Sequence, residues 1–419
     1  MIRSFTLFPG ITLRCFQSDR FKQGCLSVQF VRLMKKEEAA LNALIPAILL
    51  RGTKYHKDIR AITARLDDLY GASVSALVRR IGDYQTTGLY CAFMEDRYAF
   101  GSDRILEPMV EFLGELLFEP VVEKGGFSRE FVCSEKKNLV LAIESERNDK
   151  RAYAATRLLQ LMCREDSFGV PRLGEVAQVK KIRHNSAYEH YQKVLKESPV
   201  EIFYVGSAEP ETVAELLRPM FSTLERAYRP IPEQMPFRDC AGVHKVEKMA
   251  VTQAKLSMGF VTPITNRSEK FAAMQLLNTV YGAGMTSKLF TQIREKMSLC
   301  YSIGSGYYSS KGIMTVNAGI DAGQEQVVRQ EILRQLELCQ QVTEQELAAA
   351  KEAVLSSLRG IHDSPGAIEG YYGSATLSGA PISLAEYMAA VEAVTREQIR
   401  EAAQSLRYHS SFLLRGESE

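Results

Sequence analysis

The sequence predicts an α+β protein made of two related domains, because strand-like and helix-like patterns occur in the same order twice. Residues 26–30 (LSVQF) alternate like a half-buried strand, and residues 256–260 (LSMGF) repeat the pattern. A further apolar strand closes each copy, at residues 200–205 and 411–414. Matched segments lie about 210–230 residues apart, so a whole domain is duplicated rather than a short repeat.

Amphipathic helices are predicted between these strands. An apolar stripe with helical spacing lies in residues 105–117, and its counterpart lies in residues 328–338. A longer helix follows in each copy, and the second opens with Thr343 and Glu346, the spacing of a capping box. Each domain is therefore expected to resemble an α/β roll, in which helices pack on a mixed or antiparallel sheet.

A proline-rich stretch separates the two copies. Residues 228–236 contain three prolines in nine positions (YRPIPEQMP) and cannot continue a helix or a central strand. We expect an N-terminal domain at residues 1–225, a semi-rigid linker at 226–246, and a C-terminal domain at 247–419.

Composition excludes several classes of protein. With 46% hydrophobic and 24% charged residues the chain is typical of a folded globular protein, and 52 Lys+Arg against 50 Asp+Glu leave no basic surplus for nucleic acid. The sequence has no apolar run of about 18 residues, and its beginning lacks the apolar core of a signal peptide. The eight cysteines have no C-x-x-C spacing. We expect a cytoplasmic protein with reduced thiols and neither membrane nor nucleic-acid partners.

The histidines do not have the spacing of a zinc hydrolase. Such an enzyme carries His-Glu-x-x-His or its inverse on one helix. Among the six histidines the closest pair is His184 and His190, too far apart for either motif, and we expect both to be solvated residues at a helix end. This pattern predicts neither a metal nor another cofactor.

Other candidate chemistry is equally sparse. Glu144, Glu146 and Asp149 could serve as paired carboxylates, but such a run is more typical of a solvated face near the end of a helix predicted at residues 135–146. The sequence contains no Gly-x-Ser-x-Gly elbow and no Walker A loop.

Residues 280–303 (VYGAGMTSKLFTQIREKMSLCYSI) form the most distinctive segment. The pattern predicts a glycine hinge, a short helix, and a strand that begins with an aromatic residue. Arg294 and Tyr301 would then lie side by side at the junction of helix and strand. Both side chains donate hydrogen bonds and would suit a peptide carbonyl. The alternative is a structural arginine and a packed tyrosine.

This segment resembles the second-half signature of the insulinase/pitrilysin family of metallopeptidases, the inverzincins. In that family a Gly-rich turn, Ser-Arg-Leu-Phe, Arg-Glu and Leu-x-Tyr-Ser recur, and here Lys288 stands where arginine is usual. The resemblance extends over nearly the whole chain, including residues 49–54 (LLRGTK). It implies two homologous domains that form half of a peptidase clamshell.

The family's zinc motif is degenerate in this sequence. Where the family carries His-x-x-Glu-His, the three functional positions hold Ala43, Pro46 and Ala47, and the distal glutamate ligand falls at Ile143, or at Glu144 with a shift of one residue. The resemblance thus implies a member with no catalytic residues and no metal. Since proline inside a helix costs about 3 kcal/mol, the former metal helix should be kinked or should begin close to Pro46.

The resemblance also implies a role. The lost motif and residues 64–72 (ARLDDLYGA) are similar to the YmfF-like inactive peptidase group. Inactive members of the family pair with a zinc-containing relative, and the family's arginine and tyrosine that hold the substrate backbone match Arg294 and Tyr301. A partner subunit that helps to bind and enclose a peptide or protein substrate is therefore expected. A stand-alone peptide-binding or scaffold homodimer and an active peptidase with unorthodox ligands remain open.

Overall fold

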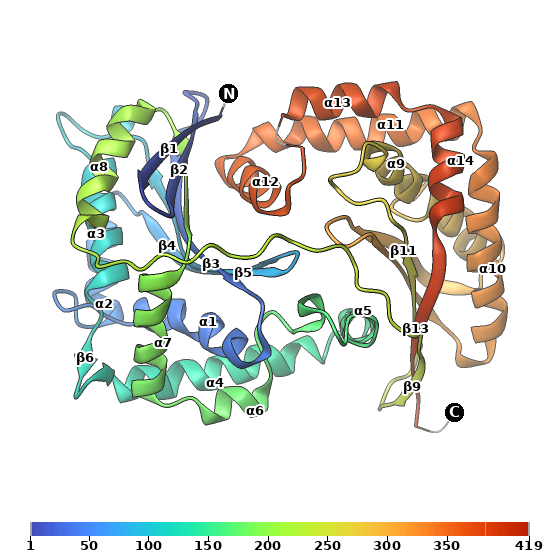
Figure 1. Cartoon of the computed structure of the whole chain (residues 1–419), viewed down its shortest axis with the longest axis horizontal. Helices are drawn as coiled ribbons and strands as arrows, with labels where there is room; N and C mark the ends of the chain where they lie inside the picture. The colour runs from blue at the N-terminus through green and yellow to red at the C-terminus, as the bar shows by residue number, and fades with distance from the viewer. Residues whose placement is uncertain (1, 382, 418–419) are drawn as a thin grey trace. The chain divides into compact units, whose positions relative to one another are not determined.

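The computed structural model describes residues 2–381 and 383–417, and the chain divides into two compact units, each built from a sheet and helices (Figure 1). Unit 1 consists of Met1–Glu144, Pro171–Glu233 and Ile361–Ser374. Unit 2 consists of Ser145–Val170, Gln234–Gly360 and Ala375–Glu419. Each unit therefore includes one segment from the opposite half of the sequence.

The sheet of unit 1 has six strands in the order β1-β2-β8-β3-β5-β4. The strands are β1 (Ile2–Phe8), β2 (Ile11–Gln17), β3 (Gln23–Leu33), β4 (Ser73–Ile81), β5 (Tyr84–Met94) and β8 (Val200–Gly206). The central strand β3 pairs antiparallel with β5 and β8, and β8 pairs parallel with β2. A separate small hairpin joins β6 (Val122–Glu123) to β7 (Gly126–Phe127).

The sheet of unit 2 repeats this pairing with five strands in the order β11-β12-β10-β13-β9. The strands are β9 (His244–Lys248), β10 (Ala254–Val261), β11 (Cys300–Tyr308), β12 (Ile313–Ile320) and β13 (Arg407–Arg415). Here β10 pairs antiparallel with β12 and β13, and β13 pairs parallel with β9. The matched strand segments found in the sequence lie on β3 and β10 and on β8 and β13. The α+β fold class with two related mixed sheets is therefore confirmed.

Helices pack on the sheet of unit 1. They are α1 (Lys36–Leu49), α2 (Ile59–Asp68), α3 (Leu106–Phe118), α4 (Arg129–Glu146), α6 (Val176–Lys181), α7 (His184–Glu197) and α8 (Pro210–Ser222), with a short 3₁₀ turn η1 (Asp96–Tyr98). Leu26, Val28 and Phe30 of β3 are buried in the same core as the apolar stripe of α3. The helix predicted at residues 105–117 thus forms where its periodicity places it.

Unit 2 has its own helices. They are α5 (Lys150–Met162), α9 (Phe271–Tyr281), η3 (Leu289–Lys296), α10 (Glu325–Leu338), α11 (Glu344–Arg359), α13 (Leu384–Ala393) and α14 (Arg396–Ser405), with short turns η2 (Ser167–Gly169), η4 (Ala322–Gln324) and η5 (Cys339–Gln341). The predicted capping box of α11 is confirmed, because the Thr343 N–H donates to Glu346 at 2.9 Å and the Glu346 N–H donates to Thr343 Oγ1 at 3.2 Å. Residues 224–243 contain no helix or strand, as the prolines predict.

On the face of the unit 1 sheet opposite this apolar core, a polar cluster binds a helix from the C-terminal half of the sequence. The chain reaches this face through η6 (Gly360–Asp363) and α12 (Pro365–Ser378). On α12 the fully buried Glu369 accepts hydrogen bonds from Ser27 Oγ at 2.7 Å and Gln29 Nε2 at 2.9 Å. It also forms a two-pronged ion pair with Arg79 of β4, both contacts being 2.9 Å long. One carboxylate therefore joins α12 to two strands.

No helix in the described part of the chain is both long enough and apolar enough to span a membrane.

Candidate functional site

Helix α1 carries the three residues that the resemblance places at the family's zinc-motif positions. Ala43 and Pro46 are buried and Ala47 is half-buried. On α4, Ile143 packs against the core of unit 1, whereas the neighbouring Glu144 is exposed. Within residues 2–381 and 383–417 no group of three or more His, Cys, Asp and Glu side chains is arranged to hold a metal ion.

Pro46 lies inside α1, which begins at Lys36, so of the two expected outcomes, a kink or a helix start close to residue 46, the helix start is wrong. Proline has no N–H to donate to the carbonyl four residues earlier, which belongs to Asn42. The Thr87 hydroxyl on β5 donates to that carbonyl instead, at 2.6 Å. Because the carbonyl is satisfied from a neighbouring strand, the helix continues past the proline.

The Asn42 side chain is the centre of a buried polar cluster next to the degenerate motif. His190 Nε2 donates to Asn42 Oδ1 at 2.7 Å, and Asn42 Nδ2 donates to Gln85 Oε1 at 2.9 Å. Gln85 Nε2 then donates to the carbonyls of Ala39 and Arg172 at 3.0 and 2.7 Å. In this series of hydrogen bonds each side chain donates to the next acceptor, so His190 carries its proton on Nε2. The cluster holds α1 against β5 and α7.

The expectation that both histidines of the closest pair are solvated is wrong for His190. This residue lies in the middle of α7 and is 8% exposed, and its bond to Asn42 compensates for its burial. His184 is the first residue of α7, half-buried, and accepts a hydrogen bond from Arg129 Nε at 3.1 Å. The signal that could have indicated the burial of His190 is the polar Asn42 amid the apolar residues of α1.

The pKa of His190 is lowered to about 4, chiefly because burial disfavours the charged form, and Arg32 and Lys193 lower it further against the opposing effect of Glu38. As the pH falls below about 6.5, His190 becomes protonated in the unfolded chain but stays neutral in the folded chain. Stability is therefore full above about pH 6.5 and is lost as the pH falls towards 4, by up to roughly 3 kcal/mol.

We expect His190→Gln, which can still donate to Asn42 Oδ1, to remove this part of the pH dependence. Urea unfolding of the wild type and the variant at about pH 7 and about pH 4.5 measures it. The wild type should lose more free energy of unfolding than the variant between the two pH values. Equal losses would show that His190 does not titrate in this way.

Arg294 lies on η3, a helix wider than an α-helix. Its backbone N–H groups donate to carbonyls five residues earlier, as the Met297 N–H does to the Gln292 carbonyl at 2.9 Å. This π-helical geometry is rare in proteins overall, but where it occurs it is often at a functional site. The Arg294 guanidinium lies 4.6 Å from the centre of the Phe290 ring, and its side chain is 41% exposed. The cation is thus supported by an aromatic face and is accessible.

Tyr301 is the second residue of β11 and is 65% exposed. The chain turns between η3 and β11 at Ser298, whose φ of 52° lies in the left-handed region, and the Leu299 N–H donates to the Ile293 carbonyl at 3.0 Å. The structure thus places Arg294 and Tyr301 on either side of one helix–strand junction, with Arg294 stacked on Phe290.

Two exposed methionines flank η3 in the sequence. Met285 precedes the helix and Met297 follows it, with 77% and 43% exposure, and methionine side chains adapt to varied binding partners. Lys288, which replaces the family's usual arginine, pairs with Glu346 of α11 and so fixes the start of η3. The junction therefore combines a rigid base with adaptable exposed side chains.

Comparison with known families and sequences identifies relatives of this chain. The family model described as "Peptidase M16 inactive domain" matches residues 181–354. A "probable inactive metalloprotease YmfF" from Bacillus subtilis (strain 168) is 27% identical over 409 residues, which cover 97% of this chain and 96% of that protein.

Solved structures agree in fold. A crystal structure of a conserved protein from Enterococcus faecalis V583 has a TM-score of 0.91 and 27% identity, covering 100% of this chain and 99% of that one. The M16 inactive domain from Pseudomonas fluorescens has a TM-score of 0.81 at 16% identity, over 99% of this chain and 98% of that one, and shows similarity of fold alone.

Proposed function

Because this chain is an inactive homologue of the M16 (insulinase/pitrilysin) peptidase family, we propose that it is the partner subunit of a zinc-bearing peptidase and helps to bind and enclose a peptide or protein substrate. The observation that carries the proposal is the occupation of the metal positions by Ala43, Pro46 and Ala47 on a complete, packed helix. In the proposed heterodimer the zinc and the general base come from the other subunit.

The packing of α1 supports a lasting loss of metal chemistry. At Ala43, with 6% exposure, and at the buried Pro46, a histidine or glutamate would meet apolar neighbours and would have to displace them. The hydrogen bonds of the Thr87 hydroxyl and of the Asn42 cluster also hold α1 on the sheet. The helix is maintained for the fold, which a substrate-binding subunit still needs.

The η3–β11 junction supplies the groups proposed to hold the substrate backbone. The Arg294 guanidinium and the Tyr301 hydroxyl are both accessible donors, and peptide carbonyls and a peptide C-terminal carboxylate are acceptors. Exposed Met285 and Met297 would cover apolar side chains of the same peptide. This arrangement suits recognition of the backbone more than of one particular sequence.

We expect Arg294→Ala to reduce peptide cleavage by a complex of this chain with a relative from the same cell that carries an intact His-x-x-Glu-His motif. Loss of one charged hydrogen bond to the substrate should lower kcat/KM about tenfold, and the complex should still elute as a heterodimer. Arg359→Ala on α11, whose side chain is 52% exposed, is the matched control and should leave cleavage unchanged.

Unchanged turnover in Arg294→Ala would contradict the role in holding substrate. The alternative, a peptide-binding or scaffold homodimer without proteolysis, predicts that the chain alone sediments as a dimer, binds peptide, and forms no complex with the zinc-bearing relative.

A further inference from the structure

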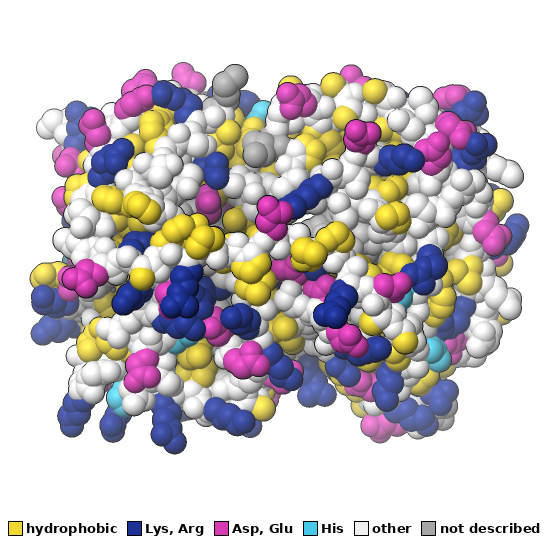
Figure 2. All heavy atoms as spheres, viewed as in Figure 1, with side chains coloured by type: hydrophobic (Ala, Val, Ile, Leu, Met, Phe, Trp, Pro, Cys, Tyr) yellow, Lys and Arg dark blue, Asp and Glu magenta, His cyan; other side chains and the backbone are white. Residues whose placement is uncertain are grey.

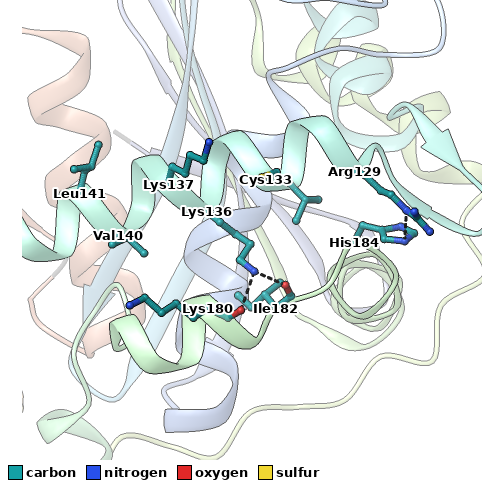
Figure 3. A pocket seen from close by; sticks show the side chains of 10 residues that line it. Arg129, Cys133, Lys136, Lys137, Val140, Leu141, Lys180, Ile182 and His184 are labelled. Carbon is teal, nitrogen blue, oxygen red and sulfur yellow. Dashed lines mark hydrogen bonds between the residues drawn. The ribbon is translucent and has the colours of Figure 1, made fainter.

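A groove of about 660 Å³ lies in unit 1 between α4 and the end of α6, away from the degenerate motif positions of α1 (Figure 3). Its lining consists of Arg129, Val132, Cys133, Lys136, Lys137, Val140, Leu141, Lys180, Ile182 and His184. None of these side chains takes part in the function proposed above.

The lining residues of α4 follow one face of that helix. They form two rows with a spacing of four residues, which lie next to each other on a helix surface. The rows are Val132, Lys136 and Val140, and Cys133, Lys137 and Leu141, with Arg129 preceding the second row. Within each set of three, an apolar or thiol side chain lies at each end and a lysine lies in the middle. Leu141 is 63% exposed and extends the apolar part of the groove to the surface.

The charge of the groove has one sign. Four of the ten lining residues are Lys or Arg, and none is acidic, although the whole chain carries a net charge of only +2. Lys136 Nζ donates to the carbonyls of Lys180 and Ile182 at 3.0 and 2.6 Å, as Figure 3 shows, so its charge is fixed between α4 and α6. Figure 2 shows Lys and Arg side chains gathered at the lower left, where Figure 1 places α4, α6 and α7.

We propose that this groove is a docking site for an amphipathic helix of another protein, with acidic side chains between its apolar ones. The apolar ends of the two α4 rows would take apolar side chains spaced at i, i+4 and i+7, and the central lysines would face Asp or Glu. A nucleic-acid backbone is bound mainly through its phosphate charges and would leave the apolar side chains of the groove exposed, whereas an amphipathic helix would bury them. This inference holds whether or not the chain joins a peptidase.

Two synthetic peptides of about 18 residues test the proposal with the full-length chain, since a helix of that length matches α4. Both are labelled amphipathic helices with leucines along one face, and their remaining positions carry glutamate in one and lysine in the other. Fluorescence anisotropy measures affinity. Cys133 is exposed and the other seven cysteines are buried or half-buried, so its alkylation by a maleimide reports occupancy of the groove itself.

We expect the glutamate peptide to bind and to slow alkylation of Cys133, and the lysine peptide to do neither. Lys137→Glu combined with Leu141→Ser should weaken binding at least about tenfold, because one charge contact and one apolar contact are lost. The matched control, Lys245→Glu with Val327→Ser, changes an exposed lysine and an exposed apolar residue of unit 2 and should bind as the wild type does. Circular dichroism checks that both variants are folded.

Four results would overturn the proposal. Equal affinity for the two peptides would show that the groove does not discriminate by charge. Binding that leaves the alkylation rate of Cys133 unchanged would show that the peptide binds elsewhere. Self-association of the chain that the groove variant abolishes would make a second copy the occupant. A labelled DNA duplex whose binding is lost in the same variant would instead identify a nucleic-acid site.

Discussion

Glu369→Ala is expected to lower the free energy of unfolding by about 3–4 kcal/mol. The carboxylate is fully buried and is the shared acceptor for Ser27, Gln29 and Arg79. Its removal leaves the Ser27 hydroxyl without this acceptor and the guanidinium without its counter-ion, while Gln29 Nε2 keeps Ser27 Oγ as an acceptor at 3.2 Å. The side chain of Arg79 is 34% exposed, so water can partly solvate the freed charge, and we expect a loss in the lower part of the range for broken buried pairs.

Urea unfolding followed by circular dichroism measures this loss, since the chain has no tryptophan. Glu352→Ala is the control for an exposed pair with Arg359 and should cost less than about 0.5 kcal/mol. Replacing Arg79 and Glu369 together by leucine should cost less than Glu369→Ala alone, because no charge is then left unpaired. A loss below about 1 kcal/mol in Glu369→Ala would show that the cluster does not hold α12 on the sheet.

Local patterns in the sequence were sufficient to predict the repeated strands and several helices. Both faces of β3 are buried, and Leu26, Val28 and Phe30 alternate with polar residues because they face the apolar core while Ser27 and Gln29 face Glu369. Thr343 with Glu346 caps α11 through bonds within four residues. Local patterns could not predict that residues 145–170 belong to unit 2 and residues 361–374 to unit 1. This arrangement depends on contacts such as that of Glu369 with Ser27, between residues far apart in the sequence.

The same distinction applies to the candidate site. That Ala43, Pro46 and Ala47 cannot be metal ligands follows from their residue types alone. The effect of Pro46 on α1 was not predictable, because the hydroxyl that satisfies the Asn42 carbonyl belongs to another element, β5. The burial of His190 was hidden for the same reason, since its partner Asn42 lies on α1.

Lys311→Met is expected to have an effect of similar size on unit 2, about 3–5 kcal/mol. The Lys311 side chain, on the turn between β11 and β12, is 1% exposed, and its Nζ lies 2.9 Å from Asp166 and 2.9 Å from the carbonyl of Met235. Asp166 is itself buried and also caps η2 by accepting the Phe168 N–H at 2.9 Å. Methionine fills most of the same volume, so the expected loss comes from the carboxylate left without its counter-ion and not from a cavity.

The ammonium of Lys311 joins three segments of unit 2: the β11–β12 turn, the exchanged segment 145–170 and the linker after α8. Its loss should therefore loosen the linker as well as lower stability, and limited proteolysis within residues 224–243 should become faster than in the wild type. Adding Asp166→Asn to Lys311→Met removes the unpaired charge while keeping an acceptor for Phe168, and should restore part of the lost free energy. If the double variant is no more stable than Lys311→Met, then the loss in Lys311→Met does not come from a carboxylate left without its counter-ion.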